Sequence, residues 1–163
     1  MQPANVLTEW ASLLFSSLAS AGVTDVVVSP GSRSTPFVVA AVREPTITCH
    51  SVIDERAAAF FALGQARITG RPSVLLCTSG TAAAHYLPAI IEAGSAFIPL
   101  LVVTADRPTE LQECAAPQTI DQTKIYGDHA RRFFDLGMPD DSADSLRALR
   151  RVAHQAVFAA MWP

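Results

Sequence analysis

The chain has 163 residues, a formal net charge of −3 at pH 7, and hydrophobic side chains at 50% of its positions. This length is enough for one domain with its own core and too short for two. The slightly acidic balance gives no electrostatic case for nucleic-acid binding. The positive mean hydropathy is high for a monomer of this size and indicates a surface that another domain or subunit covers.

Cysteine usage and the N-terminus predict a cytoplasmic protein. The cysteines are odd in number and widely spaced, and Cys49 and Cys77 lie in apolar runs, where a thiol behaves as a small hydrophobe. This pattern is typical of a reducing compartment. The N-terminus shows no basic leader with a cleavage pattern. The longest uncharged stretch, residues 72–91, is broken by a polar turn and by Pro88, so no membrane span is expected.

Apolar runs that alternate with helical stripes predict regular elements over the first two thirds of the chain. Gly22 should end the first helix, and Thr35 followed by Pro36 should open the second. Pro88 should kink a later helix, which Gly94 ends. In chain order, we predict a helix over 5–21, a strand over 25–29, a helix over 37–43, a strand over 46–52, a helix over 55–67, a strand over 73–78, a helix over 79–93 and a strand over 97–104.

The last third of the chain begins with a polar region, residues 105–129, that has no long periodicity. Residues 131–136 are predicted to form a last strand, and the apolar stripe of residues 142–161 predicts a final helix. We expect residues 1–138 to form the core of the domain. We expect residues 139–163 to form a linker and a C-terminal helix that packs on the same domain.

Strand, turn and helix recur four times, which predicts an open, mostly parallel α/β sheet with helices on both faces. In such sheets, ligands bind at the carboxyl ends of the strands. The polar clusters of the sequence follow predicted strands, at residues 30–35, 54–55, 78–81 and 104–107. Scattered surface polarity would not give this coincidence, and we therefore expect one shared site.

Two adjacent acids, Asp54 and Glu55, stand between an extended run and a very apolar helix. Asp54 suits the N-cap, because a short carboxylate accepts from the free N–H groups of the first turn. Glu55 falls in that turn, where the helix dipole favours negative charge. The residues alone leave two readings open. The carboxylates only cap the helix and pair with Arg56, or one of them does proton chemistry in a dry site.

The other turns also allow two readings. Pro30 to Ser34 combines a glycine, hydroxyls and Arg33 at a helix N-terminus, which suits a carboxylate or phosphate, but the same residues make a tight turn with Arg33 in solvent. Arg107 can hold an anion or can pair internally with Asp106. The turn at 78–82 has no Walker motif, and no Gly-x-Gly-x-x-Gly fingerprint occurs in the chain.

Two further kinds of site are not supported. The histidines show no ligand spacing with cysteine, so no metal site is expected within this chain. No Gly-x-Ser-x-Gly elbow is present, which argues against a serine hydrolase.

Six runs of residues, taken in order and at their spacing, resemble the N-terminal, pyrimidine-binding domain of thiamine-diphosphate enzymes. More narrowly, they resemble the 2-succinyl-5-enolpyruvyl-6-hydroxy-3-cyclohexene-1-carboxylate synthases of menaquinone biosynthesis. The runs are Ser29–Pro36, Asp54–Arg56, Thr78–Ala82, Ile91–Gly94, Leu101–Pro108 and Gln118–Gln122. The first and fifth are specific to the synthases, and the resemblance extends to the linker near Pro139.

The resemblance implies roles for individual residues. Glu55 would be the catalytic group and would hydrogen-bond the aminopyrimidine of thiamine diphosphate, so that the ring can exchange a proton. Cofactor contacts are implied for Pro30, Thr78 and Gln118. Substrate contacts are implied for Ser32, Arg33, Arg107 and Gln118.

The resemblance also implies partners. The enzymes decarboxylate 2-oxoglutarate and add the resulting carbanion to isochorismate, and both substrates are anionic. Their Mg2+ (or Mn2+) and the cofactor diphosphate are bound by another domain that is absent from this chain, and the cofactor lies between two subunits of a homo-oligomer. We therefore expect this chain to be inactive alone, and to need the rest of its own chain and a second subunit.

One departure from the family pattern concerns position 117, which is usually asparagine and is Pro117 here. Proline has no N–H and no side-chain amide, so an asparagine contact to substrate cannot be transferred. Two alternatives remain at this stage. The chain could belong to another thiamine-diphosphate decarboxylase or carboligase, or it could be a non-catalytic assembly module that kept the fold.

Overall fold

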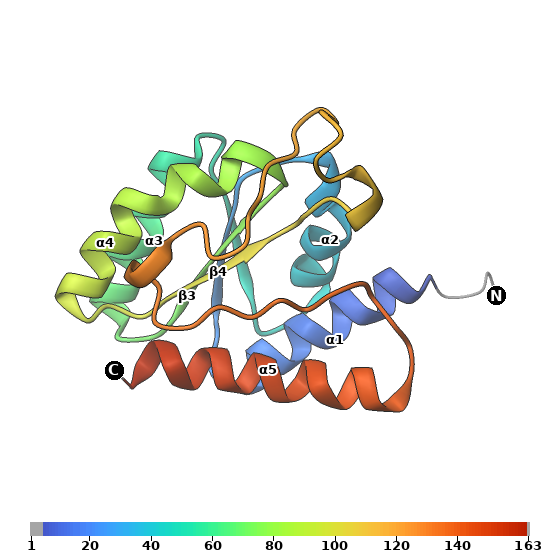
Figure 1. Ribbon diagram of the computed structural model, residues 1–163. Coiled ribbons are helices and arrows are strands. Elements are labelled where there is room, and N and C mark those ends of the chain that lie inside the picture. The colour runs from blue at the N-terminus through green and yellow to red at the C-terminus, as the bar shows by residue number, and fades with distance from the viewer. Residues whose placement is uncertain (1–4, 163) are drawn as a thin grey trace.

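The structure is a computed structural model that describes residues 5–162. Its centre is a four-stranded sheet in the order β2-β1-β3-β4, with every neighbouring pair parallel (Figure 1). The strands are β1 (Asp25–Val28), β2 (Thr48–Ser51), β3 (Ser73–Cys77) and β4 (Leu100–Thr104). The α-helices are α1 (Val6–Ser20), α2 (Thr35–Arg43), α3 (Glu55–Thr69), α4 (Leu87–Ala96) and α5 (Ala143–Met161). Short 3-10 helices are η1 (Ser32–Ser34), η2 (Gly80–Tyr86), η3 (Thr109–Leu111) and η4 (Gly127–His129).

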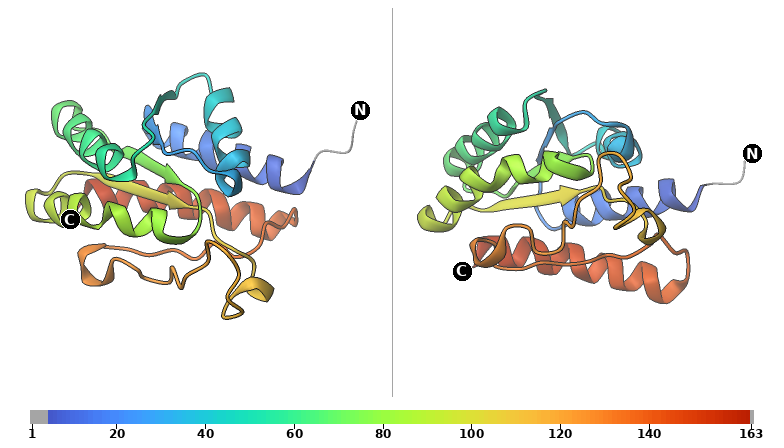
Figure 2. Two further views of the ribbon diagram at one scale, coloured as in Figure 1. Left: turned by 90° about the horizontal axis from the view of Figure 1, so that it is seen from above. Right: turned by 45° about the horizontal axis from the view of Figure 1, so that its top comes forward.

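The helices cover both faces of the sheet, as Figure 2 shows, because successive strand residues point to opposite sides. Val26 and Val74 pack into a core shared with α1, α2 and α5. Val27 and Leu75 pack on the other face, in a core shared with α3 and η2. Strands buried on both sides need continuous apolar sequence, which β1 and β3 have. The predicted open parallel α/β fold is therefore confirmed.

Local signals at the ends of α3 and α5 worked as expected. Asp54 is the N-cap of α3, and its Oδ1 accepts from the backbone N–H groups of Arg56 (2.9 Å) and Ala57 (3.3 Å). Gly70 ends α3 in the left-handed region at φ 65°. Ser142 caps α5 through a hydrogen bond that its side chain accepts from the Ser145 N–H. The helix predicted over 142–161 is confirmed, with Leu149, among others, buried in the core shared with α1.

The single kinked helix predicted over 79–93 is wrong. The segment divides into η2 and α4, and Pro88 lies in the first turn of α4. An N–H in that turn has no intrahelical partner anyway, so proline starts the helix without bending it. Gly94 lies inside α4, which ends at Ala96, and Phe97 takes the left-handed conformation at φ 55°.

The last strand predicted over 131–136 is also wrong, because this segment has no regular structure. It lies beside α5, where Arg131 Nη1 donates to the Ala160 carbonyl at 2.9 Å, and Leu136 packs against the core of α1 and α5. Figure 1 shows the segment leaving η4 and running alongside α5 towards the start of that helix. β4 therefore remains an edge strand among the described residues. No helix within residues 5–162 is long and apolar enough to span a membrane.

Candidate functional site

The turns after the four strands stand side by side along the carboxyl edge of the sheet. The chain leaves β1 towards β2 on one side and later returns to β3 on the other side of β1, so the strand order reverses between β1 and β3. Such a switch point is where open parallel sheets bind ligands. The ends of β1 and β2 are linked directly, because Ser29 Oγ donates to the Val52 carbonyl at 3.1 Å.

At the switch point, the turn after β1 touches the end of β3. A Cβ placed on Gly31 would lie 2.3 Å from Cβ of Thr78 and 2.8 Å from its Oγ1. The φ of Gly31 is −176°, which any residue adopts, so the close approach and not the backbone conformation requires glycine here. Thr78 is buried, whereas Pro30, Ser32 and Arg33 are exposed on the turn.

The two acids at the start of α3 have different surroundings. Besides capping the helix, Asp54 accepts from Nε of Arg56 at 3.0 Å and forms an ion pair with the same guanidinium, which holds the pKa of this carboxyl below its usual range. No hydrogen bond from residues 5–162 reaches the carboxylate of Glu55, which is half-buried. The capping and pairing reading therefore applies to Asp54, and Glu55 keeps both oxygens available.

Glu55 lies near two buried side chains of low reactivity, Cys77 and Tyr86. It shares a helical face with Ala58 and Ala59, which pack with Cys77 and Tyr86 in the core on that side of the sheet. Burial raises the pKa of the Cys77 thiol to about 12, and the Glu55 carboxylate adds to that effect. Burial also raises the pKa of the Tyr86 hydroxyl, and the neighbouring Cys77 and Glu55 side chains add to this effect. The Cys77 thiol and the Tyr86 hydroxyl therefore stay protonated at neutral pH.

The loop that follows β4 covers the carboxyl edge of the sheet next to β3 and β4. Gln118 is exposed, and its carbonyl accepts from Ser79 Oγ at 3.1 Å. Gln122 is buried and accepts from the Gly80 N–H at 2.7 Å through Oε1. The side-chain Nε2 of Gln122 donates to the Ala105 carbonyl at 3.1 Å. The loop is therefore tied to the turns after both β3 and β4.

Arg107 points towards this loop and does not pair with Asp106. Its Nη2 donates to the Pro117 carbonyl at 3.0 Å, while its Nε is buried without a hydrogen-bond partner among residues 5–162. Asp106 accepts from the backbone N–H of Arg107 at 2.7 Å, and partial burial raises the pKa of its carboxyl. The internal ion pair considered from the sequence is thus not formed in the described part of the chain.

The structure places every predicted site residue on one edge of the sheet. Pro30, Ser32, Arg33 and Thr78 follow β1 and β3, Glu55 follows β2, and Arg107 and Gln118 belong to the segment after β4. Sequence reasoning did not single out Ser29 or Gln122 individually, although both fall inside the quoted runs. It did single out Gly31, as a point where the backbone can pass close to a ligand, and in the structure Gly31 closely approaches Thr78. A buried glutamine in a polar loop gives no local signal, because its partners are distant in sequence.

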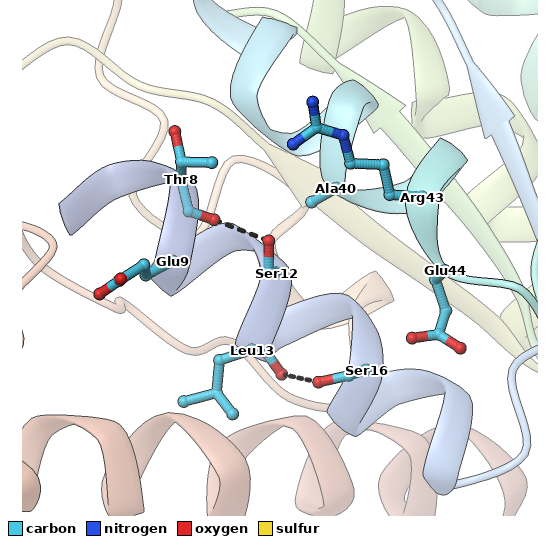
Figure 3. Close-up of a pocket in the computed structure, with 8 residues that line it drawn as sticks. All are labelled: Thr8, Glu9, Ser12, Leu13, Ser16, Ala40, Arg43 and Glu44. Atoms are coloured by element: carbon cyan, nitrogen blue, oxygen red, sulfur yellow. Dashed lines mark hydrogen bonds between the residues drawn. The ribbon is translucent and has the colours of Figure 1, made fainter. Parts of the chain in front are cut away.

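A separate groove of about 460 Å3 lies between α1 and α2 and contains none of these residues (Figure 3). Its serines turn back to their own helix: Ser12 Oγ donates to the Thr8 carbonyl and Ser16 Oγ to the Leu13 carbonyl. Within residues 5–162, no group of three or more histidine, cysteine or acidic side chains is arranged to hold a metal ion.

Comparison with known proteins matches most of this chain to one family. The model of the family described as "Thiamine pyrophosphate enzyme, N-terminal TPP binding domain" matches residues 8–125. Three curated relatives carry the name 2-succinyl-5-enolpyruvyl-6-hydroxy-3-cyclohexene-1-carboxylate synthase. The relative from Sorangium cellulosum is 61% identical over 100% of this chain, that from Haloquadratum walsbyi 53% over 98%, and that from Geobacillus kaustophilus 51% over 94%. The matches cover 26%, 26% and 27% of these relatives, so the chain spans about a quarter of their length.

Fold and site together define a parallel α/β domain with its ligand-binding edge at a topological switch point. The chain belongs to the family of N-terminal TPP-binding domains of thiamine pyrophosphate enzymes.

Proposed function

We propose that this chain is the pyrimidine-binding part of a thiamine-diphosphate-dependent synthase of menaquinone biosynthesis. The observation that carries the proposal is the 61% identity, over the whole chain, to a relative named 2-succinyl-5-enolpyruvyl-6-hydroxy-3-cyclohexene-1-carboxylate synthase. Residues 1–138 would form the pyrimidine-binding core, and residues 139–163 a linker and a helix that belongs to the same domain. The protein would act in the cytoplasm.

The residues of the edge fit an aminopyrimidine ring. Glu55 offers a half-buried carboxylate without a hydrogen-bond partner from residues 5–162, at the N-terminus of a helix that favours negative charge. Because Gly31 has no Cβ, the turn after β1 can meet the turn after β3, and Pro30 and Thr78 are candidate walls of the cofactor pocket. When bound, thiamine diphosphate supplies an electron sink for the decarboxylation of a 2-oxo acid. Glu55 would hold a proton between its carboxylate and a pyrimidine ring nitrogen.

The remaining candidates suit anionic substrates. Arg33 is exposed on its turn, and Arg107 uses one Nη donor on the Pro117 carbonyl while its Nε stays unpaired among residues 5–162. A guanidinium binds a carboxylate best through two parallel N–H groups. Arg33, Arg107, Ser32 and Gln118 would therefore orient 2-oxoglutarate and isochorismate at the carboxyl edge.

The proposal includes a partner, because the described residues offer no metal cluster and the relatives are about four times longer. Mg2+ or Mn2+, and the cofactor diphosphate, would be bound by the rest of the protein and by a second subunit. The apolar surface of α3 supports such a partner: Phe60 and Phe61 are 49% and 46% exposed, and Ile68 is 88% exposed. Apolar surface of this kind marks an interface.

Turnover tests the proposal. The complete enzyme that contains this chain should release CO2 from 2-oxoglutarate and form the isochorismate adduct when thiamine diphosphate and Mg2+ are present. The 163-residue chain alone should not. Turnover of pyruvate in place of 2-oxoglutarate would assign the chain to another thiamine-dependent decarboxylase. Activity of the chain alone would show that no partner is needed.

A further inference from the structure

Gln122 is a buried side chain of the carboxyl edge that makes three hydrogen bonds, yet nothing in the proposed chemistry uses it. It is 6% exposed. Its Oε1 accepts from the Gly80 N–H at 2.7 Å, and its Nε2 donates to the Ala105 carbonyl at 3.1 Å and to Thr104 Oγ1 at 3.2 Å. One amide therefore joins three segments: the turn after β3, the end of β4 and its own loop.

The loop that Gln122 holds is strained. Gln118, four residues earlier, has a left-handed φ of 58°, as do Glu113 (57°), Ala115 (55°) and Lys124 (51°). Side-chain-bearing residues adopt this conformation only where the surrounding structure enforces it. Two contacts hold Gln118 in this conformation: its carbonyl accepts from Ser79 Oγ, and that same oxygen lies 2.9 Å from the position a Cβ would take on Gly80.

Both candidate substrate contacts on this side depend on the same anchor. Gln122 fixes Gly80, against which the backbone of Gln118 packs, and it fixes the Ala105 carbonyl two residues before Arg107. Arg107 in turn donates to the Pro117 carbonyl, next to Gln118. A change in the amide would move Gln118 and Arg107 together, although within residues 5–162 neither side chain forms a hydrogen bond with Gln122.

The geometry points to Gln122 as a positioning residue for substrate recognition, which sets Gln118 and Arg107 without contacting the substrate itself. The inference rests on the proposed function, because it assumes that these two residues bind the anionic substrate. It assigns to a buried amide the task of holding a strained loop in its binding conformation. Misplacing a binding group by about 1 Å can cost about 100-fold in rate.

The test uses Gln122→Met in the complete enzyme, with Gln65→Met as its matched control. Gln65 is also a networked glutamine, which donates to Asp25 Oδ1 at 2.8 Å and accepts from Ser73 Oγ at 2.8 Å, but it lies at the amino end of the strands. Both variants are measured at a temperature where circular dichroism shows them folded. We expect Gln122→Met to lower kcat/KM for 2-oxoglutarate at least about tenfold, mostly through KM, and Gln65→Met to change it less than about twofold.

A double-mutant cycle separates positioning from general loss of stability. In a Gln118→Ala background, the loss caused by Gln122→Met should shrink at least about threefold, because residues that act as a unit are not additive. An unshrunk, additive loss would overturn the inference, as would a folded Gln122→Met variant with unchanged KM and kcat. If the unmutated enzyme itself fails to turn over 2-oxoglutarate, the proposed function fails instead, and the two failures are distinguishable.

Discussion

The contact between Gly31 and Thr78 gives a sharp test of how the carboxyl edge is built. In a Gly31→Ala variant, the new Cβ would lie 2.3 Å from Cβ of Thr78, whereas non-bonded carbons sit about 3.5 Å apart. The two turns must therefore separate by about 1.2 Å. Because the atom met is a Cβ and not the far end of a flexible side chain, the backbone at the end of β3 has to move.

The expected cost follows from overpacking. Inserting one methyl group into a closed contact costs about 1–3 kcal/mol. For a chain of this size, each kcal/mol lowers Tm by about 2–4 °C, so thermal unfolding followed by circular dichroism should show a fall of about 2–12 °C. The φ of −176° at Gly31 adds no backbone strain, and the effect is therefore steric.

Three matched variants make the result decisive. Gly64→Ala, inside α3 with nothing within 4 Å of its new Cβ, should be stabilising by about 0.5–1 kcal/mol. Thr78→Gly removes the opposing Cβ and should relieve much of the Gly31→Ala cost in a double-mutant cycle, whereas Thr78→Ala keeps that carbon and should not. A Gly31→Ala variant as stable as the unmutated chain would refute the close approach of the two turns.

Three further outcomes are expected. The hydrogen bond from Arg56 lowers the folded-state pKa of Asp54, so the ionised carboxylate stabilises the fold at neutral pH and this contribution fades as the pH falls below about 4. The difference in Tm between the unmutated chain and Asp54→Ala should therefore narrow from pH 7 to pH 3. A difference in Tm that does not change with pH would contradict the capping geometry. A thiol reagent should label exposed Cys114 first and buried Cys77 only on unfolding, because burial raises the pKa of Cys77 to about 12. Mass spectrometry would follow the labelling, and early labelling of Cys77 would be inconsistent with its burial. In the complete enzyme, Arg107→Lys should raise the KM for 2-oxoglutarate at least about tenfold, since lysine lacks the planar fork; an unchanged KM in steady-state assays would remove Arg107 from the substrate contacts.

The sequence predicted those features that local chemistry decides. Asp54 caps its helix because the acid stands immediately before an apolar periodic run, and β1 and β3 are buried strands because their residues are continuously apolar. The site edge was predictable for a related reason, since parallel strands bring the turns that follow them together.

Features set by distant contacts were not predictable from the sequence. From the sequence alone, Pro88 could kink a longer helix or stand in the first turn of a new one. Which of the two occurs depends on whether the preceding residues form η2. Residues 131–136 have strand-like composition, but the segment contacts α5, so it forms no ladder. Gln122 is an ordinary loop residue until the fold brings Gly80 and Ala105 to its two ends.

Hydrogen–deuterium exchange at C2 of thiamine diphosphate would report the proposed proton transfer by Glu55. NMR would follow this exchange in the complete enzyme and in its Glu55→Gln variant, with Gly64→Ala on the same helix as control. Loss of a positioned proton-transfer group should slow exchange by at least about 100-fold, while the chain stays folded, because residues 5–162 make no side-chain hydrogen bond to the Glu55 carboxylate. Exchange in Glu55→Gln at the rate of the unmutated enzyme would contradict the assignment.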